Sequence, residues 1–254
     1  MLGSKEVMVL TDESTKRFFD GASHLLIQQT DTLERQVSHF FTDLQFRCAT
    51  FRELQGYLDR NLANDFNIFD YIAPDENRLS KIIADLLRPD SPHGQSSIFL
   101  EAFLQLIRIS DERYYPDKIR NIVQEDSTVY ASAFQRRIDI TLDFGYVGIG
   151  IENKPWAGEQ QDQLQDYQVH LSRKYSNNFV LIYLSGNGTE PQSLTPQTMK
   201  DLRTQGRLRV LTYRPDLQRW LETCYKECHA EKVRWFLRDF AKYVTQHFPI
   251  LHQP

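Results

Sequence analysis

The sequence has few of the features that mark secreted, membrane or fibrous proteins. It contains three cysteines in 254 residues, too few for a disulfide framework. No apolar run approaches the roughly 18 residues that cross a bilayer, and the start of the chain lacks the zones of a signal peptide. With 41% hydrophobic and 25% charged residues and no internal repeat, the chain is expected to be a globular cytoplasmic protein with no membrane partner.

The sequence also lacks an excess of positive charge. Lys and Arg total 30 against 34 Asp and Glu, which gives a formal net charge of −4. Nucleic-acid binding through bulk positive potential is therefore excluded, and any polyanion must meet a local patch. Cys224, Cys228 and His229 have no second ligand pair at zinc-finger spacing, so we expect them to pack or to face solvent.

The first third of the chain predicts helix. Large apolar residues recur at near-helical spacing between Thr32 and Leu58, over a stretch without proline. This pattern predicts one or two amphipathic helices that form a helical layer or arm. We expect a boundary near residue 65, which separates an N-terminal helical segment, residues 1–65, from a domain of residues 66–254.

A buried helix is predicted to follow Asp75. Apolar residues from Leu79 to Leu87 recur at i, i+3, i+4, i+7 and i+8, and Pro89 ends the pattern. Glu76 lies on the same stripe. Its carboxylate either points inward, where it needs a partner, or complements the helix dipole, and the sequence favours neither. Residues 97–109 predict a second buried helix.

Two strands are predicted at residues 137–143 and 147–154, joined as a hairpin, with Ile138, Ile140 and Leu142 on one apolar face. The near-continuous apolar run at 179–185 predicts a central strand, parallel to the strand before the intervening helix. The remaining predicted elements are a helix at 158–175, a helix at 195–205, a strand at 208–213, and helices at 215–228 and 231–248.

The candidate catalytic side chains, two acids and a lysine, lie on this predicted hairpin. A two-residue turn with glycine first places Asp139 directly opposite Glu152, where two like charges repel. A divalent cation removes this conflict, and oxygen ligands suit Mg²⁺ or Mn²⁺. Lys154 lies on the same strand face, where its ammonium can orient a water or hold a phosphate oxygen. Gly148 and Gly150 on this face are expected to leave room for a bulky substrate. The alternative is an ordinary solvated hairpin face.

The order of these residues resembles the PD-(D/E)XK nuclease superfamily, which has the restriction-endonuclease-like fold. The resemblance lies in three elements and their order: a helix with Glu76, a strand with Ile138–Asp139, and a strand with Glu152–Asn153–Lys154. Ile138 stands where the family name has proline. Gln163 and Tyr167 resemble the Q-x-x-x-Y motif of the recombination-exonuclease branch. Residues 75–104 are similar to an uncharacterised bacterial branch suspected in defence against foreign DNA.

The resemblance implies an α/β fold, a restriction-endonuclease-like mixed sheet flanked by helices, with an additional N-terminal helical segment. It implies a Mg²⁺-dependent nuclease, with Mn²⁺ as an alternative ion, that hydrolyses phosphodiester bonds of DNA. The implied metal ligands are Glu76, Asp139, Glu152 and the Asn153 carbonyl, and Lys154 would position the attacking water. Gln163 and Tyr167 would face the cleft and bond a phosphate or the lysine. The alternative, from periodicity, is that Tyr167 belongs to the core and Gln163 to the surface.

Other residues have weaker functional interpretations. Phosphate contacts are candidate roles for Arg136, Arg137, Arg173 and Lys174. Trp156 is a candidate for base stacking or a packing anchor, and His93 is more typical of a structural loop histidine. Expected partners are DNA, with RNA as an alternative, and a second copy or a defence-system protein. A noncatalytic nucleic-acid- or partner-binding protein that retains the fold is the alternative function.

Overall fold

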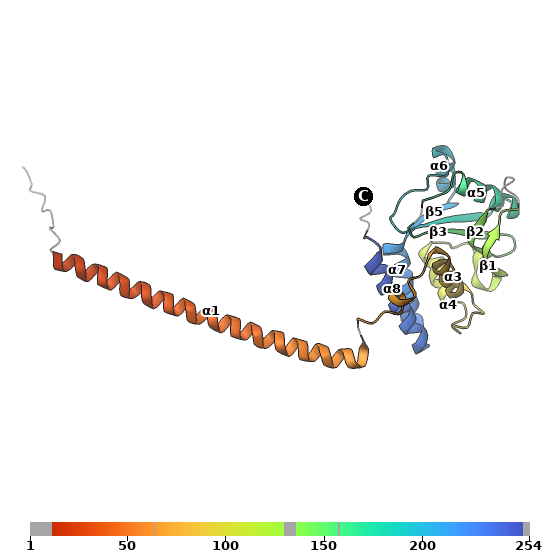
Figure 1. Ribbon diagram of the computed structural model, residues 1–254. Coiled ribbons are helices and arrows are strands. Elements are labelled where there is room, and N and C mark those ends of the chain that lie inside the picture. The colour runs from red at the N-terminus through yellow and green to blue at the C-terminus, as the bar shows by residue number, and fades with distance from the viewer. Residues whose placement is uncertain (1–11, 64, 130–135, 157, 251–254) are drawn as a thin grey trace, which may run out of the picture. The chain divides into compact units, whose positions relative to one another are not determined.

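The computed structural model describes residues 12–63, 65–129, 136–156 and 158–250. The chain divides into two compact units, Met1–Phe66 and Asn67–Pro254. The first unit contains α1 (Asp12–Leu62), a single helix of 51 residues that begins well before the predicted Thr32 (Figure 1). Along α1 the large apolar side chains are exposed. No helix within the described ranges is both long and apolar enough to cross a membrane.

A mixed sheet forms the centre of the second unit. Among the described residues, five strands follow one another in the order β1-β2-β3-β4-β5. The strands are β1 (Asn121–Ser127), β2 (Arg137–Asp143), β3 (Gly148–Lys154), β4 (Phe179–Ser185) and β5 (Leu208–Thr212). β2 pairs antiparallel with both β1 and β3, whereas β4 pairs parallel with both β3 and β5. The predicted central, parallel position of β4 is confirmed. The sequence did not predict β1, an edge strand with one buried residue, Ile122.

The β2–β3 hairpin has the predicted register where the two strands pair. Ile140 lies opposite Ile151 and Asp143 opposite Gly148, and Gly145 in the turn has a φ of +91°. The ladder ends at Ile140. Beyond it the prediction of a single apolar face is wrong, because Ile138 packs in a different core cluster from Ile140 and Leu142. Strict alternation is therefore lost where β2 reaches Asp139.

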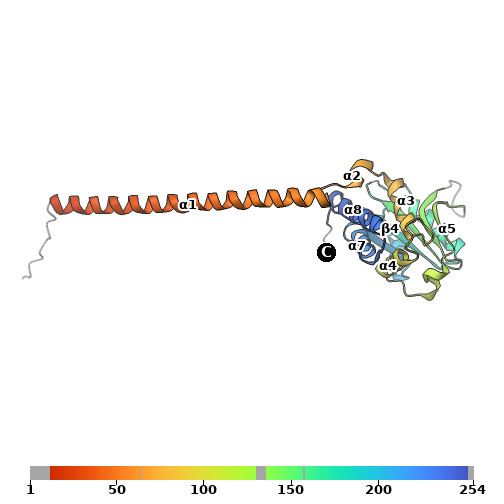
Figure 2. The same ribbon diagram turned by 90° about the horizontal axis from the view of Figure 1, so that it is seen from below.

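Helices cover both faces of the sheet (Figures 1 and 2). One cluster joins Ile140, Leu142 and Ile151 to the helices α3 (Glu76–Leu87), α4 (Ile98–Leu106), α7 (Gln218–Glu227) and α8 (Glu231–His247). The other cluster joins Leu181 and Tyr183 to α5 (Gln163–Lys174) and α6 (Pro196–Thr204). The short elements are α2 (Ile68–Ile72), the 3-10 turns Glu112–Tyr114 and Pro116–Lys118, and a π-helical turn, Tyr213–Leu217. This is the predicted α/β class, a mixed sheet flanked by helices.

The two helices nearest the hairpin begin for different local reasons. Asp75 caps α3, because its side chain accepts a hydrogen bond from the Arg78 N–H at 2.8 Å. The helix predicted from Gly158 instead begins at Gln163, since Asp162 adopts a left-handed backbone with φ of 57°. Glu76 is thus placed in the first turn of α3, and Gln163 at the first residue of α5.

The β3 glycines serve packing, and the expectation that they make room for a substrate is wrong. A Cβ on Gly148 would overlap the ring of Tyr175, at the end of α5. A Cβ on Gly150 would lie 2.8 Å from Leu171 Cδ1 in the same helix. Their missing side chains let α5 lie close against the sheet, which brings the N-terminal turn of α5 toward the end of β3.

Candidate active site

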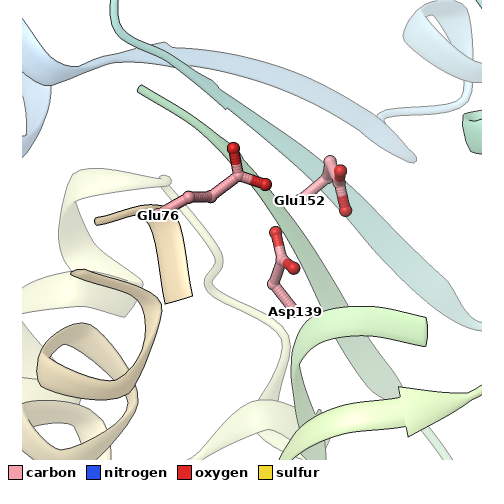
Figure 3. Close-up of side chains that lie close together, drawn as sticks. All are labelled: Glu76, Asp139 and Glu152. Atoms are coloured by element: carbon pink, nitrogen blue, oxygen red, sulfur yellow. The ribbon is translucent and has the colours of Figure 1, made fainter. Parts of the chain in front are cut away.

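Three carboxylates from three separate elements meet at the end of the β2–β3 hairpin. Glu76 comes from α3, Asp139 from β2 and Glu152 from β3, and all three point toward one another (Figure 3). One oxygen of each lies within 4.8 Å of the others. Within the described ranges, this is the one group of three or more His, Cys, Asp or Glu side chains close enough to share a metal ion.

Asp139 is held by the backbone of β3. The Asn153 N–H donates to Asp139 Oδ2 at 2.7 Å, in place of the ladder bond that the register would give it. The N–H and C=O of one strand residue point to the same side, so the Asn153 carbonyl faces the same gap between β2 and β3. The opening of the ladder therefore presents a carboxylate and a main-chain oxygen side by side.

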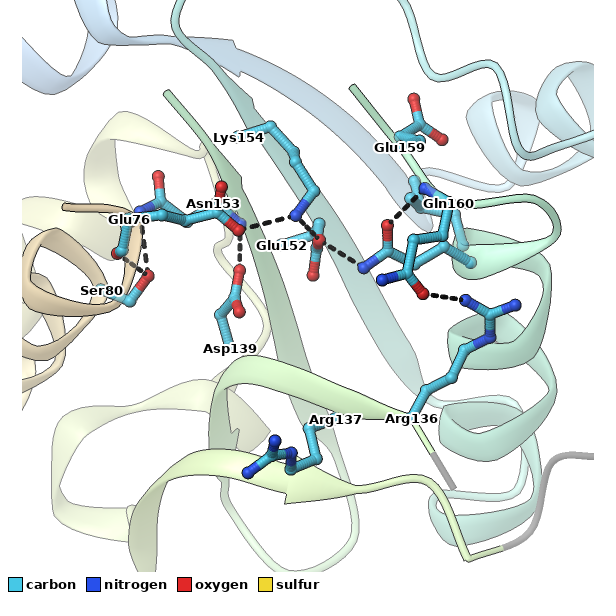
Figure 4. Close-up of polar contacts among 12 residues, drawn as sticks. Glu76, Ser80, Arg136, Arg137, Asp139, Glu152, Asn153, Lys154, Glu159 and Gln160 are labelled. Carbon is cyan, nitrogen blue, oxygen red and sulfur yellow. Dashed lines mark hydrogen bonds and ion pairs between the residues drawn. The ribbon is translucent and has the colours of Figure 1, made fainter. Parts of the chain in front are cut away.

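Lys154 is the cation of this cluster. Its Nζ lies 2.8 Å from Glu76 Oε1 and 2.7 Å from Glu152 Oε1 (Figure 4). Burial alone would lower the pKa of this amine. The charge of Glu152 and the hydrogen bonds to Glu152 and Glu76 outweigh burial, so the pKa of Lys154 is raised and the amine is an ammonium.

Glu152 is the most buried of the three acids, with none of its surface exposed. Its Oε1 accepts hydrogen bonds, but its Oε2 is buried without a hydrogen-bond partner. Burial, with the nearby charge of Asp139, raises the pKa of Glu152 to about 8. Burial also raises the pKa of Asp139 to about 6, against the opposing effect of the Asn153 N–H. Three acids share one ammonium, and an oxygen lacks a partner, so this donor set fits a hard divalent cation.

Gln163 and Tyr167, both in α5, form a hydrogen-bonded chain that ends at Glu152. Gln163 Nε2 donates to Glu152 Oε1 at 2.7 Å and to Tyr167 Oη at 2.9 Å. Tyr167 is almost fully buried, and its hydroxyl donates to the Arg137 carbonyl at 2.5 Å. Both side chains face the site, as predicted, but their hydrogen bonds reach Glu152 and a strand carbonyl rather than Lys154.

A pocket of about 540 Å³ opens over the cluster. Its rim includes Arg136, which is held by Asp166 at 2.7 Å and by Gln160 at 2.8 Å, and Arg137, which pairs with Glu125. The pocket is lined by Glu76, Asn77, Glu125, Arg136, Arg137, Asp139, Lys154, Gln160, Gln163 and Tyr167. The two arginines thus sit where a phosphate could reach them.

The other candidate residues lie elsewhere. Lys174 pairs with Asp126 at 2.8 Å and, like Arg173, does not line this pocket. His93 stabilises the loop between α3 and α4 through the Arg88 carbonyl and the Gln95 N–H. Trp156 is half-exposed and stacks on Phe248.

Two residues that support the site were missed in the sequence. The Asn153 side chain donates to Ser80 Oγ at 2.9 Å and accepts from Tyr213 Oη at 2.7 Å, which fixes this part of β3. Ser80 lies one helical turn after Glu76, a spacing that could have suggested it. Tyr213 follows β5, and no local pattern marks it.

A family model for the PD-(D/E)XK nuclease superfamily matches residues 66–242. The chain belongs to this superfamily. Membership implies nuclease activity, the hydrolysis of phosphodiester bonds, and superfamily members typically depend on a divalent metal. The match extends beyond residues 75–185, where the sequence resemblance lay, and it takes in α7 and most of α8. Comparison with curated proteins found no match, and comparison with solved structures found none either.

Proposed function

We propose that this PD-(D/E)XK protein is a Mg²⁺-dependent deoxyribonuclease, with Mn²⁺ as an alternative ion. The observation that carries the proposal is the convergence of three carboxylates beside one ammonium, with Glu152 Oε2 buried and unpartnered. Such an arrangement is costly without a cation, because the acids repel one another in a site that water solvates poorly.

Glu76, Asp139, Glu152 and the Asn153 carbonyl would hold the ion. When bound, a divalent ion lowers the pKa of water and neutralises charge that builds on a phosphate. The hydrogen bond from the Asn153 N–H holds Asp139 in place, and Ser80 and Tyr213 hold Asn153 in turn. The ligands are thus oriented before any ion binds, which is what a catalytic metal site requires.

Lys154 is a catalytic residue that acts through its own ammonium and is not one of the ligands of the ion. Its ammonium lies between Glu76 and Glu152 and lines the pocket, where it can orient a water and hold a phosphate oxygen. Gln163 is a positioning residue, since it bonds Glu152 Oε1, and Tyr167 positions Gln163. Arg136 and Arg137 would contact flanking phosphates at the rim.

DNA is the proposed substrate, and defence of a bacterium against foreign DNA the proposed role, on the resemblance to a branch suspected of that role. The proposal includes a cytoplasmic location, because foreign DNA is met there. It assigns catalysis to residues 66–254 and treats residues 1–65 as a separate helical segment.

The test is cleavage by the purified full chain with Mg²⁺ or Mn²⁺. Supercoiled, linear and single-stranded DNA and single-stranded RNA serve as substrates. We expect DNA to be cut, and Lys154→Ala to lower the rate on the order of 10²- to 10⁴-fold. Lys200→Ala, at an exposed lysine of α6, is the matched control and should cut at the wild-type rate.

Titration calorimetry with the metal alone separates the enzyme from a binding protein. The proposal expects Mg²⁺ or Mn²⁺ to bind the wild type and not Asp139→Ala. DNA binding without cleavage, equal in wild type and Lys154→Ala and independent of metal, would instead identify a noncatalytic nucleic-acid-binding protein. Cleavage of RNA alone would reject the DNA assignment and retain the chemistry.

A further inference from the structure

Helix α1 carries an apolar stripe that lies on one side. Residues spaced alternately by four and three positions from Phe19 to Leu58 form this stripe, here called the seam. Its members are Phe19, Ser23, Leu26, Thr30, Leu33, Val37, Phe40, Leu44, Arg47, Phe51, Leu54 and Leu58. Nine of the twelve are apolar, and each of these nine is at least 43% exposed. A spacing that averages 3.5 residues is that of a left-handed coiled coil.

The seam requires a partner helix. A long helix in water draws most of its stability from burial of its apolar face, and contiguous exposed apolar surface marks an interaction site. The core clusters of the second unit are built from residues from Phe69 onward, so no seam residue belongs to them. We propose that a second copy of α1 covers the seam, and that the two helices run antiparallel. This inference does not depend on the proposed nuclease activity.

The polar residues of the seam decide the direction. In a parallel pair in register, Arg47 would face Arg47 of the second copy inside the seam, where like charges repel. An antiparallel pair, with its two-fold axis between Val37 and Phe40, places Arg47 opposite Thr30 instead. The other facing pairs are Phe19 with Leu58, Ser23 with Leu54, Leu26 with Phe51, Leu33 with Leu44, and Val37 with Phe40.

The antiparallel pair thus matches apolar residues to apolar residues and polar to polar in every layer except Ser23 with Leu54. Glu34 of the second copy lies one helical turn from its Thr30, within reach of the Arg47 guanidinium. In the single helix this guanidinium bonds Asp43 at 2.9 Å and remains largely exposed. The symmetry is closed, so the pair does not extend into a filament.

The antiparallel direction separates the two points at which the nuclease units are attached to α1. The two C-terminal ends of α1 lie at opposite ends of the pair, about 70 Å apart at a rise of 1.5 Å per residue. The two nuclease units are therefore attached far from each other, and α1 by itself does not bring two active sites to one cut.

Cys48 provides a distance test in the full chain. It is exposed on α1, whereas Cys224 and Cys228 are buried, so a thiol-reactive spin label should attach at Cys48. The antiparallel pair predicts a separation of about 30 Å between the two labelled positions, and a parallel pair about 15 Å or less. Cys48→Ser is the labelling control. A short distance would overturn the antiparallel direction, and a single-chain mass by sedimentation equilibrium would overturn the pairing itself.

Three variants extend the test by sedimentation equilibrium, with tryptophan fluorescence as the folding control for the second unit. Leu44→Glu, in the seam, should raise the dimer dissociation constant at least tenfold, whereas its neighbour Gln45→Glu should leave it unchanged. Thr30→Glu should tighten the pair, because the new acid faces Arg47. In a parallel pair the same acid would face itself and weaken association, so weaker association overturns the proposed direction. A larger assembly, or a monomer that captures another protein, overturns the two-copy arrangement.

Discussion

The two carboxylate oxygens of Glu152 differ in their surroundings. Oε1 accepts hydrogen bonds from Lys154 and Gln163, while Oε2 is buried without a partner. Folding raises the pKa of this carboxyl above its ordinary 4.5, so at pH 7 its ionised form opposes folding when no metal is bound. On the proposed function, the free-energy cost of burying this carboxylate in the metal-free protein is offset when a cation binds.

Glu152→Gln should stabilise the metal-free protein. The amide keeps the shape and the Oε1 acceptor but cannot ionise, so folding no longer has to protonate this carboxyl or bury its charge beside Asp139. We expect about 1 kcal/mol, or a rise in Tm of about 2–4 °C. Added Mg²⁺ should raise the Tm of the wild type and not that of the variant. Glu222→Gln, at an exposed acid of α7, is the control, and a lower Tm for Glu152→Gln than for Glu222→Gln would contradict the argument.

His93 is bonded in its neutral form. Nδ1 accepts the Gln95 N–H at 3.0 Å, and Nε2 donates to the Arg88 carbonyl at 3.0 Å. Burial lowers the pKa of His93 below 6.5, against hydrogen bonds and the charge of Asp85 that raise it. A proton added at Nδ1 would face the Gln95 N–H, so the loop should weaken as the pH falls.

The stability that His93 contributes should therefore be present above pH 6.5 and be lost below it, because the unfolded chain binds the proton more tightly. Urea unfolding, followed by tryptophan fluorescence at pH 5, 6, 7 and 8, measures this. The free energy of unfolding of the wild type should exceed that of His93→Gln at pH 8, and the difference should shrink toward pH 5. A difference that stays constant with pH would show that His93 does not titrate in this way.

At the scale of elements, the fit between α5 and β3 positions the site. Gly148 and Gly150 let α5 approach the sheet, and Gln163 at its first turn reaches Glu152 at 2.7 Å. The hairpin alone therefore does not complete the site, since the contact to Glu152 from α5 depends on this close packing.

Gly148→Ala should displace α5, since its Cβ would overlap the Tyr175 ring. The expected loss is about 1–3 kcal/mol in the free energy of unfolding, with a smaller loss for Gly150→Ala, whose neighbour is the flexible end of Leu171. Gly158→Ala is the matched control, because a Cβ there meets no atom within 4 Å. Urea unfolding measures all three variants, and equal losses at positions 148 and 158 would contradict the packing role.

On the scale of the whole molecule, the two units have separate sources of stability. Both core clusters of the second unit draw on residues from Phe69 to Phe248. The exposed seam of α1 is stabilised, on our proposal, by a second copy of the helix. Loss of α1 should therefore leave the nuclease unit folded.

Deletion of residues 1–62 should change the free energy of unfolding of the second unit by less than about 0.5 kcal/mol, because none of the deleted residues belongs to its core clusters. Trp156, Trp220 and Trp235 all lie in that unit, so their fluorescence reports it alone. The full chain at the same protein concentration is the reference. A deletion variant that unfolds early or precipitates would show that α1 contributes to the core.

The sequence by itself determined the features that depend on neighbouring residues. The apolar periodicity of α3 and β4 and the cap at Asp75 are local, and so is the hairpin register, because a two-residue turn fixes which residues face each other. That register also predicted Asp139 directly opposite Glu152; the two carboxylates do meet in one cluster, but the ladder ends at Ile140 and does not include this pair. The superfamily was recognised from the order of the same few residues.

Only the tertiary structure decided what depends on contacts between distant segments. Three such contacts join residues far apart in the chain. They are the ion pair of Glu76 with Lys154, the hydrogen bonds of Asn153 with Ser80 and Tyr213, and the packing of α5 on the β3 glycines. Local pattern cannot encode such contacts, because each depends on how the helices lie on the sheet. The edge strand β1 escaped prediction for the same reason, since pairing with β2, and not apolar periodicity, makes it a strand.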